Sequence, residues 1–268
     1  MTIQDYHWDS VDYARNSSAQ FEWATELIDK LKLRDDEAVL DIGCGDGKIS
    51  AALAARVPQG CVVGIDSSEE MITLAGRSFP KATYPNLSFK IMDARYLTFL
   101  GQFDVAFSSA ALHWISDQRA VLEGVRKSLK SGGRLLFQMG GKGNADGVFA
   151  VFNNLLTHEK WKNFFRNFTF EYAFYGAKEY LTLLREAGLE PAKAELVPKD
   201  MRQLGRNGLA GWIRTTWLPY TQCIPENLRE EFISEVVDAY LNSHPLDIQG
   251  FAHVAMMRLE VEARVSKT

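Results

Sequence analysis

The stretch Val39–Ser50 (VLDIGCGDGKIS) constrains the fold of this chain more than any other part of its sequence. It opens within the mostly apolar run 38–42, which is typical of a buried strand, and continues with glycines at alternate positions, Gly43, Gly45 and Gly47. A helical pattern of apolar residues follows directly. Strand, glycine turn and helix together bring bare backbone N–H groups against a nucleotide-like ligand, and glycine is required where a Cβ would block that approach.

Two acidic residues stand at informative distances from this turn. Asp41 precedes Gly43 by two residues, and Asp66 follows Gly47 by 19 residues, at the end of the apolar run 61–65. An acid at the end of the second strand can accept hydrogen bonds from both ribose hydroxyls of a nucleoside. A glycine run alone is also compatible with a turn that merely packs tightly, but the two acids make a nucleoside site the better interpretation.

The motifs D-I-G-C-G-D-G and G-I-D-S-S-x-x-M resemble the class I S-adenosylmethionine-dependent methyltransferases. The resemblance implies that S-adenosyl-L-methionine is the cofactor and that the three glycines cradle its methionine end. It further implies that Asp41 lies near the cofactor's ammonium group and that Asp66 holds the ribose. Asp93, directly after an expected strand over 87–92, stands where such enzymes place the acid that bonds the adenine amino group.

The same resemblance assigns further residues to the cofactor site. Met71 would flank the adenine, with a plain core position as the alternative. Trp8 and Tyr13 are costly to expose to water, and the resemblance implies that the N-terminal segment closes over the cofactor mouth; core packing without ligand contact is the alternative. The remaining cofactor-binding candidates are Cys44, Ser67, Ala94, Ser108, Ser109 and His113.

The order of strands and helices predicts the fold class. Apolar strand patterns alternate with helical patterns over 17–140, which predicts an α/β, doubly wound parallel sheet. A sixth strand is expected over 189–197, and a last strand over 251–265 would pair antiparallel at the sheet edge beside strand five. The expected fold is thus the Rossmann-like methyltransferase fold, with a mostly parallel seven-stranded sheet. The first five strands are expected at 38–42, 61–65, 87–92, 103–108 and 134–139.

The amino-acid composition changes after Gly140, which predicts a second structural region in the chain. Residues 149–180 hold eleven aromatic side chains with imperfect periodicity. We therefore expect an aromatic-rich, mostly helical insertion that roofs a substrate pocket, although a packed helical subdomain explains the same pattern. The predicted cofactor-binding core covers 1–140 and 248–268 and includes strand six at 189–197. The predicted substrate cap covers 141–188 and 199–247.

The segment Ser108–Ile115 (SSAALHWI) is similar to the motif after strand four in trans-aconitate and juvenile hormone acid methyltransferases. His113 could bond a substrate carboxylate oxygen or act as a base on a neutral substrate; a structural histidine is the alternative. Trp114 would form an apolar wall. Arg214, between two tryptophans, is the expected cation for a carboxylate, with a surface salt bridge as the alternative.

These residues predict an S-adenosylmethionine-dependent methyltransferase that O-methylates a small carboxylic acid. One alternative is an N- or C-methyltransferase that uses His113 as its base. The other is a non-catalytic nucleotide-binding domain, which would bind NAD in place of S-adenosylhomocysteine. His113, Trp114 and Arg214 are the catalytic candidates of the first interpretation.

Composition and charge narrow the partners. The chain of 268 residues has a formal net charge of −4, which does not favour a nucleic-acid partner. Three cysteines and five histidines show neither a disulfide framework nor metal-ligand spacing, so no metal is expected. Neither a membrane span nor a signal peptide is recognisable. We therefore expect a cytoplasmic enzyme for a small molecule, present as a monomer or homodimer, that does not bind membranes.

Overall fold

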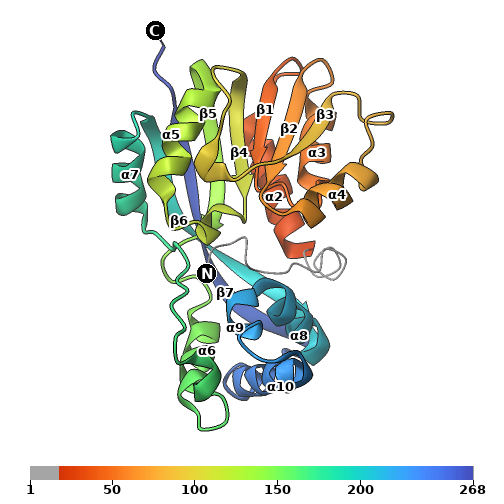
Figure 1. Ribbon diagram of the computed structural model, residues 1–268, viewed down its shortest axis with the longest axis vertical. Helices are drawn as coiled ribbons and strands as arrows, with labels where there is room; N and C mark the ends of the chain where they lie inside the picture. The colour runs from red at the N-terminus through yellow and green to blue at the C-terminus, as the bar shows by residue number, and fades with distance from the viewer. Residues whose placement is uncertain (1–17, 268) are drawn as a thin grey trace. The chain divides into compact units, whose positions relative to one another are not determined.

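The structure is a computed structural model that describes residues 18–267 (Figure 1). The described chain divides into two compact units. The sheet unit holds Gln20–Lys142, Tyr172–Val197 and the chain from Arg258, and the helical unit holds Gly143–Glu171 and Pro198–Met257. Two of the boundaries between the units fall within strands, namely β6 (Glu190–Leu204) and β7 (Phe251–Arg264), and two others follow Lys142 and Glu171.

The sheet has seven strands in the order β3-β2-β1-β4-β5-β7-β6. The first five strands pair in parallel, and β7 pairs antiparallel with β5. This order, which runs outward from β1 in both directions, confirms the predicted α/β class with a doubly wound, mostly parallel sheet. The first five strands are β1 (Ala38–Ile42), β2 (Cys61–Asp66), β3 (Leu87–Ile91), β4 (Phe103–Ser109) and β5 (Leu129–Gly140).

Strand β4 shows why the sheet is covered on both faces. Its alternate side chains enter two different hydrophobic clusters, because successive residues of a strand point to opposite faces. Val105 and Phe107 are buried with residues of α2 and α3, whereas Ala106 is buried with residues of α5 and α7. The helices of this unit are α2 (Ser18–Leu31), α3 (Lys48–Arg56), α4 (Glu69–Ser78), α5 (Gln118–Ser128) and α7 (Ala177–Glu186).

The helical unit is organised around aromatic side chains. The ring of Phe152 stacks on Tyr220 with a centroid distance of 4.3 Å and lies 5.1 Å from Trp217. Phe232 meets Trp161 edge-on at 5.2 Å. Much of the aromatic enrichment is therefore explained by a packed core, and the substrate-cap role remains a prediction. The helices are α6 (Asp146–Thr157), α8 (Gly205–Thr216), α9 (Leu218–Thr221) and α10 (Glu226–Ser243).

The sequence placed one strand wrongly. The last strand does pair antiparallel with β5, but it is not the edge strand, because β6 lies outside it. Strand β6 is also longer than the predicted 189–197, and it extends to Leu204. The predicted cap range 141–188 differs from the helical unit as well: Tyr180 and Leu184 of α7 are buried in the core of the sheet unit. Among the described residues, no helix combines the length and the apolarity that a membrane span requires.

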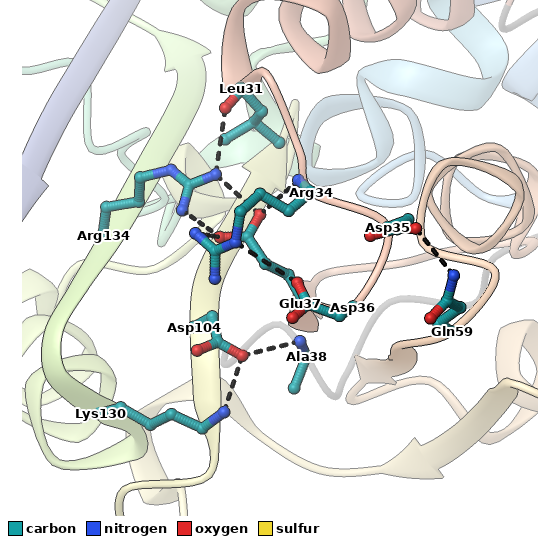
Figure 2. A network of polar contacts seen from close by, with 10 residues as sticks. All are labelled: Leu31, Arg34, Asp35, Asp36, Glu37, Ala38, Gln59, Asp104, Lys130 and Arg134. Carbon is teal, nitrogen blue, oxygen red and sulfur yellow. Dashed lines mark hydrogen bonds and ion pairs between the residues drawn. The ribbon is translucent and has the colours of Figure 1, made fainter.

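A polar network lies at the amino ends of the central strands (Figure 2). The carboxylate of Glu37, which is buried, accepts hydrogen bonds from Arg134 Nη1 at 2.6 Å and Nη2 at 2.9 Å, and from the backbone N–H of Arg34 at 3.0 Å. Burial alone would raise the pKa of Glu37, but the hydrogen bonds from Arg134 and Arg34 and their charges lower it overall. Arg134 Nη2 also donates to Leu31 O at 3.1 Å, so the network ties β5 to the end of α2.

We expect Glu37→Gln to lower the free energy of unfolding by roughly 2 kcal/mol at pH 7, because it leaves the Arg134 guanidinium with a neutral partner. The lowered pKa of the folded state means that this contribution is present above the unfolded pKa of Glu37 and is lost as the pH falls through the folded one. The difference between the proteins should therefore shrink below about pH 4. Urea unfolding followed by circular dichroism at several pH values measures it.

Asp36→Asn is the matched control, because Asp36 pairs with Arg34 at 3.3 Å while both side chains are 63% exposed. It should change the free energy of unfolding by less than about 0.5 kcal/mol. Equal effects of the two substitutions would contradict a stabilising role for the buried network.

Candidate functional site

The glycine turn between β1 and α3 is pinned to the carboxyl end of β2. The backbone N–H groups of Gly43 and Cys44 both donate to Ile65 O, at 2.8 and 2.9 Å. The carboxylate of Asp66 accepts from Gly45 N through Oδ2 at 3.0 Å and from Ser68 N through Oδ1 at 2.9 Å. The two predicted motifs, the glycine turn after β1 and the acid at the end of β2, are therefore in direct contact. Asp66 helps to fix the shape of the turn.

The three glycines of the turn all have positive φ, but they differ in their surroundings. A Cβ on Gly43 would lie 2.2 Å from the Cβ of Ala111, and one on Gly47 would lie 2.8 Å from the ring of Phe89. These two positions need glycine for internal packing. A Cβ on Gly45, where φ is +52°, would meet no atom within 4 Å. The backbone of Gly45 is thus the part of the turn that a ligand can approach closely.

Asp41, on β1, is buried beside this turn. Its Oδ2 accepts a hydrogen bond from Ser50 Oγ at 2.5 Å. Burial, and secondly the charge of Asp66, raise the pKa of Asp41 to about 7, although the hydrogen bond from Ser50 acts in the opposite direction. Burial also raises the pKa of Asp66. Two desolvated acids near one another make this edge of the sheet a favourable place for a positive group.

Asp93 follows β3 and caps the short 3₁₀ helix η2 (Ala94–Tyr96). Its carboxylate accepts from Arg95 Nε at 3.0 Å and from Arg95 Nη2 at 2.5 Å, and Oδ1 also accepts from Arg95 N at 2.9 Å. Burial would raise the pKa of Asp93, but these hydrogen bonds and the charge of Arg95 lower it overall. The carboxylate is ionised at neutral pH and can accept further hydrogen bonds. Arg95 was not anticipated as its partner.

The smaller predicted residues lie around the same strand ends. Ser68, next to the predicted Ser67, caps α4 by accepting from Met71 N at 3.3 Å. Ser108 is buried and donates its Oγ hydrogen to Ile42 O at 2.8 Å, so its hydroxyl group joins β4 to β1. Ser109 is the last residue of β4. Cys44, Met71 and Ala94 are buried.

His113 lies after β4 in the 3₁₀ helix η3 (Leu112–Trp114) and is buried. Its Nδ1 accepts a hydrogen bond from the backbone N–H of Gly140, at the end of β5, at 3.3 Å. Its carbonyl accepts from Ala173 N at 2.8 Å, which brings the segment 172–174 alongside. The aromatic neighbours of its ring, at centroid distances of 5.7–5.9 Å, are Trp114, Tyr172 and Phe174.

The protonation of His113 follows from these contacts. Burial, and then the positive charge of Arg258, lower its pKa well below the ordinary value, so the imidazole is neutral at pH 7. Because Nδ1 accepts the N–H of Gly140, the single ring proton resides on Nε2. His113 is therefore a hydrogen-bond donor through Nε2. A non-glycine residue with positive φ, Ala110 at +58°, lies just before η3, and such backbone strain is concentrated at functional sites.

Arg214 does not lie as predicted. It belongs to α8 in the helical unit and holds the carboxylate of Glu230 with two hydrogen bonds, from Nε at 2.7 Å and from Nη2 at 2.8 Å. This bidentate pair uses the Nε and Nη2 donors of the guanidinium, the edge that a substrate carboxylate would also bind. The structure thus shows the salt bridge that was the alternative for Arg214, and its predicted contact with a substrate is not supported by this arrangement. Trp8 and Tyr13 lie outside the described residues.

Three residues near His113 were not among the candidates: Tyr172, Phe174 and Arg258. The first two belong to the aromatic-rich stretch, whose composition was noticed but whose individual contacts depend on the fold. Arg258 lies within β7, where the sequence pattern predicts a strand but contains no motif that predicts a functional residue. Among the described residues, no three histidine, cysteine or acidic side chains are grouped as metal ligands.

Comparisons with known proteins show what the chain is similar to. A family model described as "Methyltransferase domain" matches residues 39–133. The chain is 32% identical over 215 residues to the uncharacterized methyltransferase C70.08c of Schizosaccharomyces pombe, a match that covers 75% of this chain and 79% of the relative. It is 28% identical over 244 residues to a trans-aconitate 2-methyltransferase of Mycolicibacterium gilvum, covering 90% and 92%. The solved YcgJ protein of Bacillus subtilis superposes with a TM-score of 0.62 at 20% identity, over 92% of this chain and 100% of that one.

The fold and the site define a nucleoside-cofactor enzyme of the α/β class. The chain belongs to the class I S-adenosylmethionine-dependent methyltransferases, and within them it is similar to the trans-aconitate 2-methyltransferases. It is thus a transferase with S-adenosyl-L-methionine as its cofactor, and the predicted family, the methyltransferase activity and the cofactor are confirmed.

The raised pKa of Asp41 predicts that this residue lowers the free energy of unfolding at high pH but not at low pH. A folded pKa of about 7 against an unfolded value of 3.8 means that the folded state binds the extra proton between these values. The stability that this proton brings is present at low pH and is lost as the pH rises through about 7. Asp41→Asn should therefore match the wild type at pH 4 and have a higher free energy of unfolding at pH 8, by at most about 4 kcal/mol.

Urea unfolding at pH 4, 6 and 8 measures this difference. Asp29→Asn is the control, since Asp29 pairs with Arg56 while its side chain is 60% exposed, and its effect should not vary with pH by more than about 0.5 kcal/mol. An Asp41→Asn protein that is less stable than the wild type at pH 8 would contradict the burial argument.

Proposed function

We propose that this methyltransferase esterifies the carboxylate of a small organic acid with an apolar body. The observation that carries the proposal is the neutral imidazole of His113, whose Nε2–H is a donor inside a wall of Trp114, Tyr172 and Phe174. A buried donor can hold a carboxylate oxygen, and the aromatic rings suit an apolar body. The name of the relative from Mycolicibacterium gilvum points to an acid as substrate there.

Methyl transfer to a carboxylate fits this histidine. S-adenosylmethionine supplies an electrophilic methyl group, so that a C–O bond forms as the C–S bond breaks, the sulfonium becomes a neutral thioether, and no proton has to move. The protein then has to orient the acceptor and exclude water, for which a fixed donor and an apolar wall suffice. A phenol, amine or carbon acid would instead need a base.

The N- or C-methyltransferase alternative requires His113 to take up a proton at Nε2. With Nδ1 accepting the Gly140 N–H, a proton on Nε2 is already present in the neutral form. The nearby charge of Arg258 opposes the imidazolium that a base would become. Both observations favour the esterifying reaction over general-base catalysis.

The residues of the glycine turn fit the assigned cofactor. The open surroundings of Gly45 leave room for a ligand against the backbone, and the desolvated acids Asp41 and Asp66 favour a positive ligand such as one that carries an ammonium and a sulfonium. We assign Asp41 to the ammonium group, Asp66 to the ribose and Asp93 to the adenine. Cys44, Ser67, Met71, Ala94, Ser108 and Ser109 are the further candidates for the cofactor contact.

The partners and location predicted from composition remain proposals. We propose a small-molecule acceptor, no nucleic-acid partner, a monomeric or homodimeric state and a cytoplasmic location. The helical unit is proposed to cap the substrate.

Alanine at two glycines of the turn should separate packing from cofactor contact. Gly45→Ala should fold with a loss of about 1 kcal/mol, because its Cβ meets only open space, and should weaken binding of S-adenosylhomocysteine at least about tenfold. Gly43→Ala should lower the melting temperature strongly, because its Cβ would collide with Ala111. Calorimetric titration and thermal melting measure the two effects. Undiminished cofactor affinity in a folded Gly45→Ala protein would contradict the assignment.

Incubation with labelled S-adenosylmethionine and a panel of acids, phenols and amines tests the reaction. We expect a base-labile product from an acid, about 14 Da heavier by one added CH₂, and a kcat that is nearly constant from pH 6 to 9 at saturating cofactor, because no base titrates. His113→Leu should raise the KM of the acid about tenfold and lower kcat less than about threefold. His113→Gln, which keeps an N–H donor, should recover part of the loss. A steep fall of kcat in both variants would instead support the general-base alternative.

A further inference from the structure

Arg258 is a buried cation at the same edge of the sheet as the proposed reaction site. Its residue is only 3% exposed. In the antiparallel pairing of β7 with β5, Arg258 lies opposite Gly140, the last residue of β5. The N–H of that same Gly140 donates to Nδ1 of His113. Gly140 is therefore paired with Arg258 across the sheet and hydrogen-bonded to the side chain of His113.

The guanidinium of Arg258 is held by an aromatic ring. Its Cζ lies 5.7 Å from the centre of the Trp23 ring of α2, within the range of a cation–π contact. Further along the same face of β7, Glu260 accepts from Gln138 Nε2 at 3.0 Å through Oε1 and from Lys30 Nζ at 2.5 Å through Oε2. Glu260 thus joins β7 to β5 and α2, and Trp23 is one of the contacts that fix the Arg258 side chain.

Its charge also reaches the imidazole. The pKa of His113 is lowered by burial first and by the positive charge of Arg258 second. The site that was described as a neutral donor with an apolar wall therefore also has a fixed positive charge. A buried guanidinium attracts a carboxylate strongly and repels an ammonium group, because both effects grow as water is excluded.

We propose that Arg258 is the residue that selects the substrate: its guanidinium, together with the Nε2–H of His113, binds the carboxylate of the methyl acceptor and disfavours amines. This inference rests on the proposed esterifying function and names the cation that the sequence had sought in Arg214. Arginine suits this task better than lysine, since its planar fork can meet both oxygens of a carboxylate.

The test measures, by calorimetric titration, the equilibrium binding of acids to the protein loaded with S-adenosylhomocysteine. The probes are trans-aconitate and decanoate, one highly charged and one with an apolar body, and decylamine is the cationic comparison. Arg258→Gln should weaken binding of the acid that the wild type prefers at least about 30-fold, and Arg258→Lys should weaken it about three- to tenfold. Arg258→Gln should also narrow the preference for decanoate over decylamine.

Arg264→Gln is the matched control, because it removes a positive charge from the same strand, where the side chain of Arg264 is 68% exposed and pairs with Glu190. It should change acid binding less than twofold. Affinity for S-adenosylhomocysteine and the melting curve report whether each variant is folded, and Arg258→Lys keeps the test valid if Arg258→Gln is unstable.

The outcomes separate this inference from the proposed function. Acid binding that depends on Arg258 without any ester product would support the inference and reject the function. Ester formation with an unchanged KM in a folded Arg258→Gln or Arg258→Lys protein would overturn the inference and leave the function intact. Failure of the wild type to bind either acid would also overturn the inference.

Discussion

The attachment of the glycine turn to the end of β2 is the interaction on which the rest of the site depends. Two successive N–H groups of the turn, from Gly43 and Cys44, donate to the single carbonyl of Ile65, and Asp66 then takes the N–H of Gly45. A turn with three positive φ angles has few internal hydrogen bonds, so its shape has to be fixed from outside. Because β2 supplies both the carbonyl and the carboxylate, the order of the parallel strands is itself a requirement of the site.

The same edge of the sheet concentrates groups whose charge is controlled by burial. Asp41 and Asp66 have raised pKa values because water is excluded from them, and His113 has a lowered one for the same reason. Arg258, buried nearby in β7, adds a charge that keeps the imidazole neutral. Opposite charges are thus distributed over the edge: acids around the glycine turn, where a positive cofactor is assigned, and a cation where an anionic acceptor is proposed.

The two edges of the sheet differ in what their charges do. At the amino ends, the carboxylate of Glu37 is matched by two arginines and a backbone N–H, which lowers its pKa and stabilises the folded state (Figure 2). At the carboxyl ends, burial raises the pKa of Asp41 to about 7, so that its ionised form lowers the stability of the folded state. Ala110, at the same edge, has a strained backbone. A protein that concentrates strain and desolvated charge at one edge needs compensating interactions elsewhere, and the network around Glu37 is one of them.

The sequence by itself determined the fold class, the cofactor and the glycine turn with its two acids, because these depend on short-range patterns: alternating strands and helices, and glycines at fixed spacing. It also named His113, four residues after the end of β4, whose role in the reaction stays a proposal. It named Arg214 as the expected cation and did not consider Arg258, which lies in a stretch whose pattern predicts only a strand. Only the tertiary structure paired Arg214 with Glu230 and placed Arg258 opposite Gly140, because strand register and helix packing join residues far apart in the chain. The protonation of His113 was likewise decided by the fold, through a backbone N–H 27 residues away and the burial of the ring.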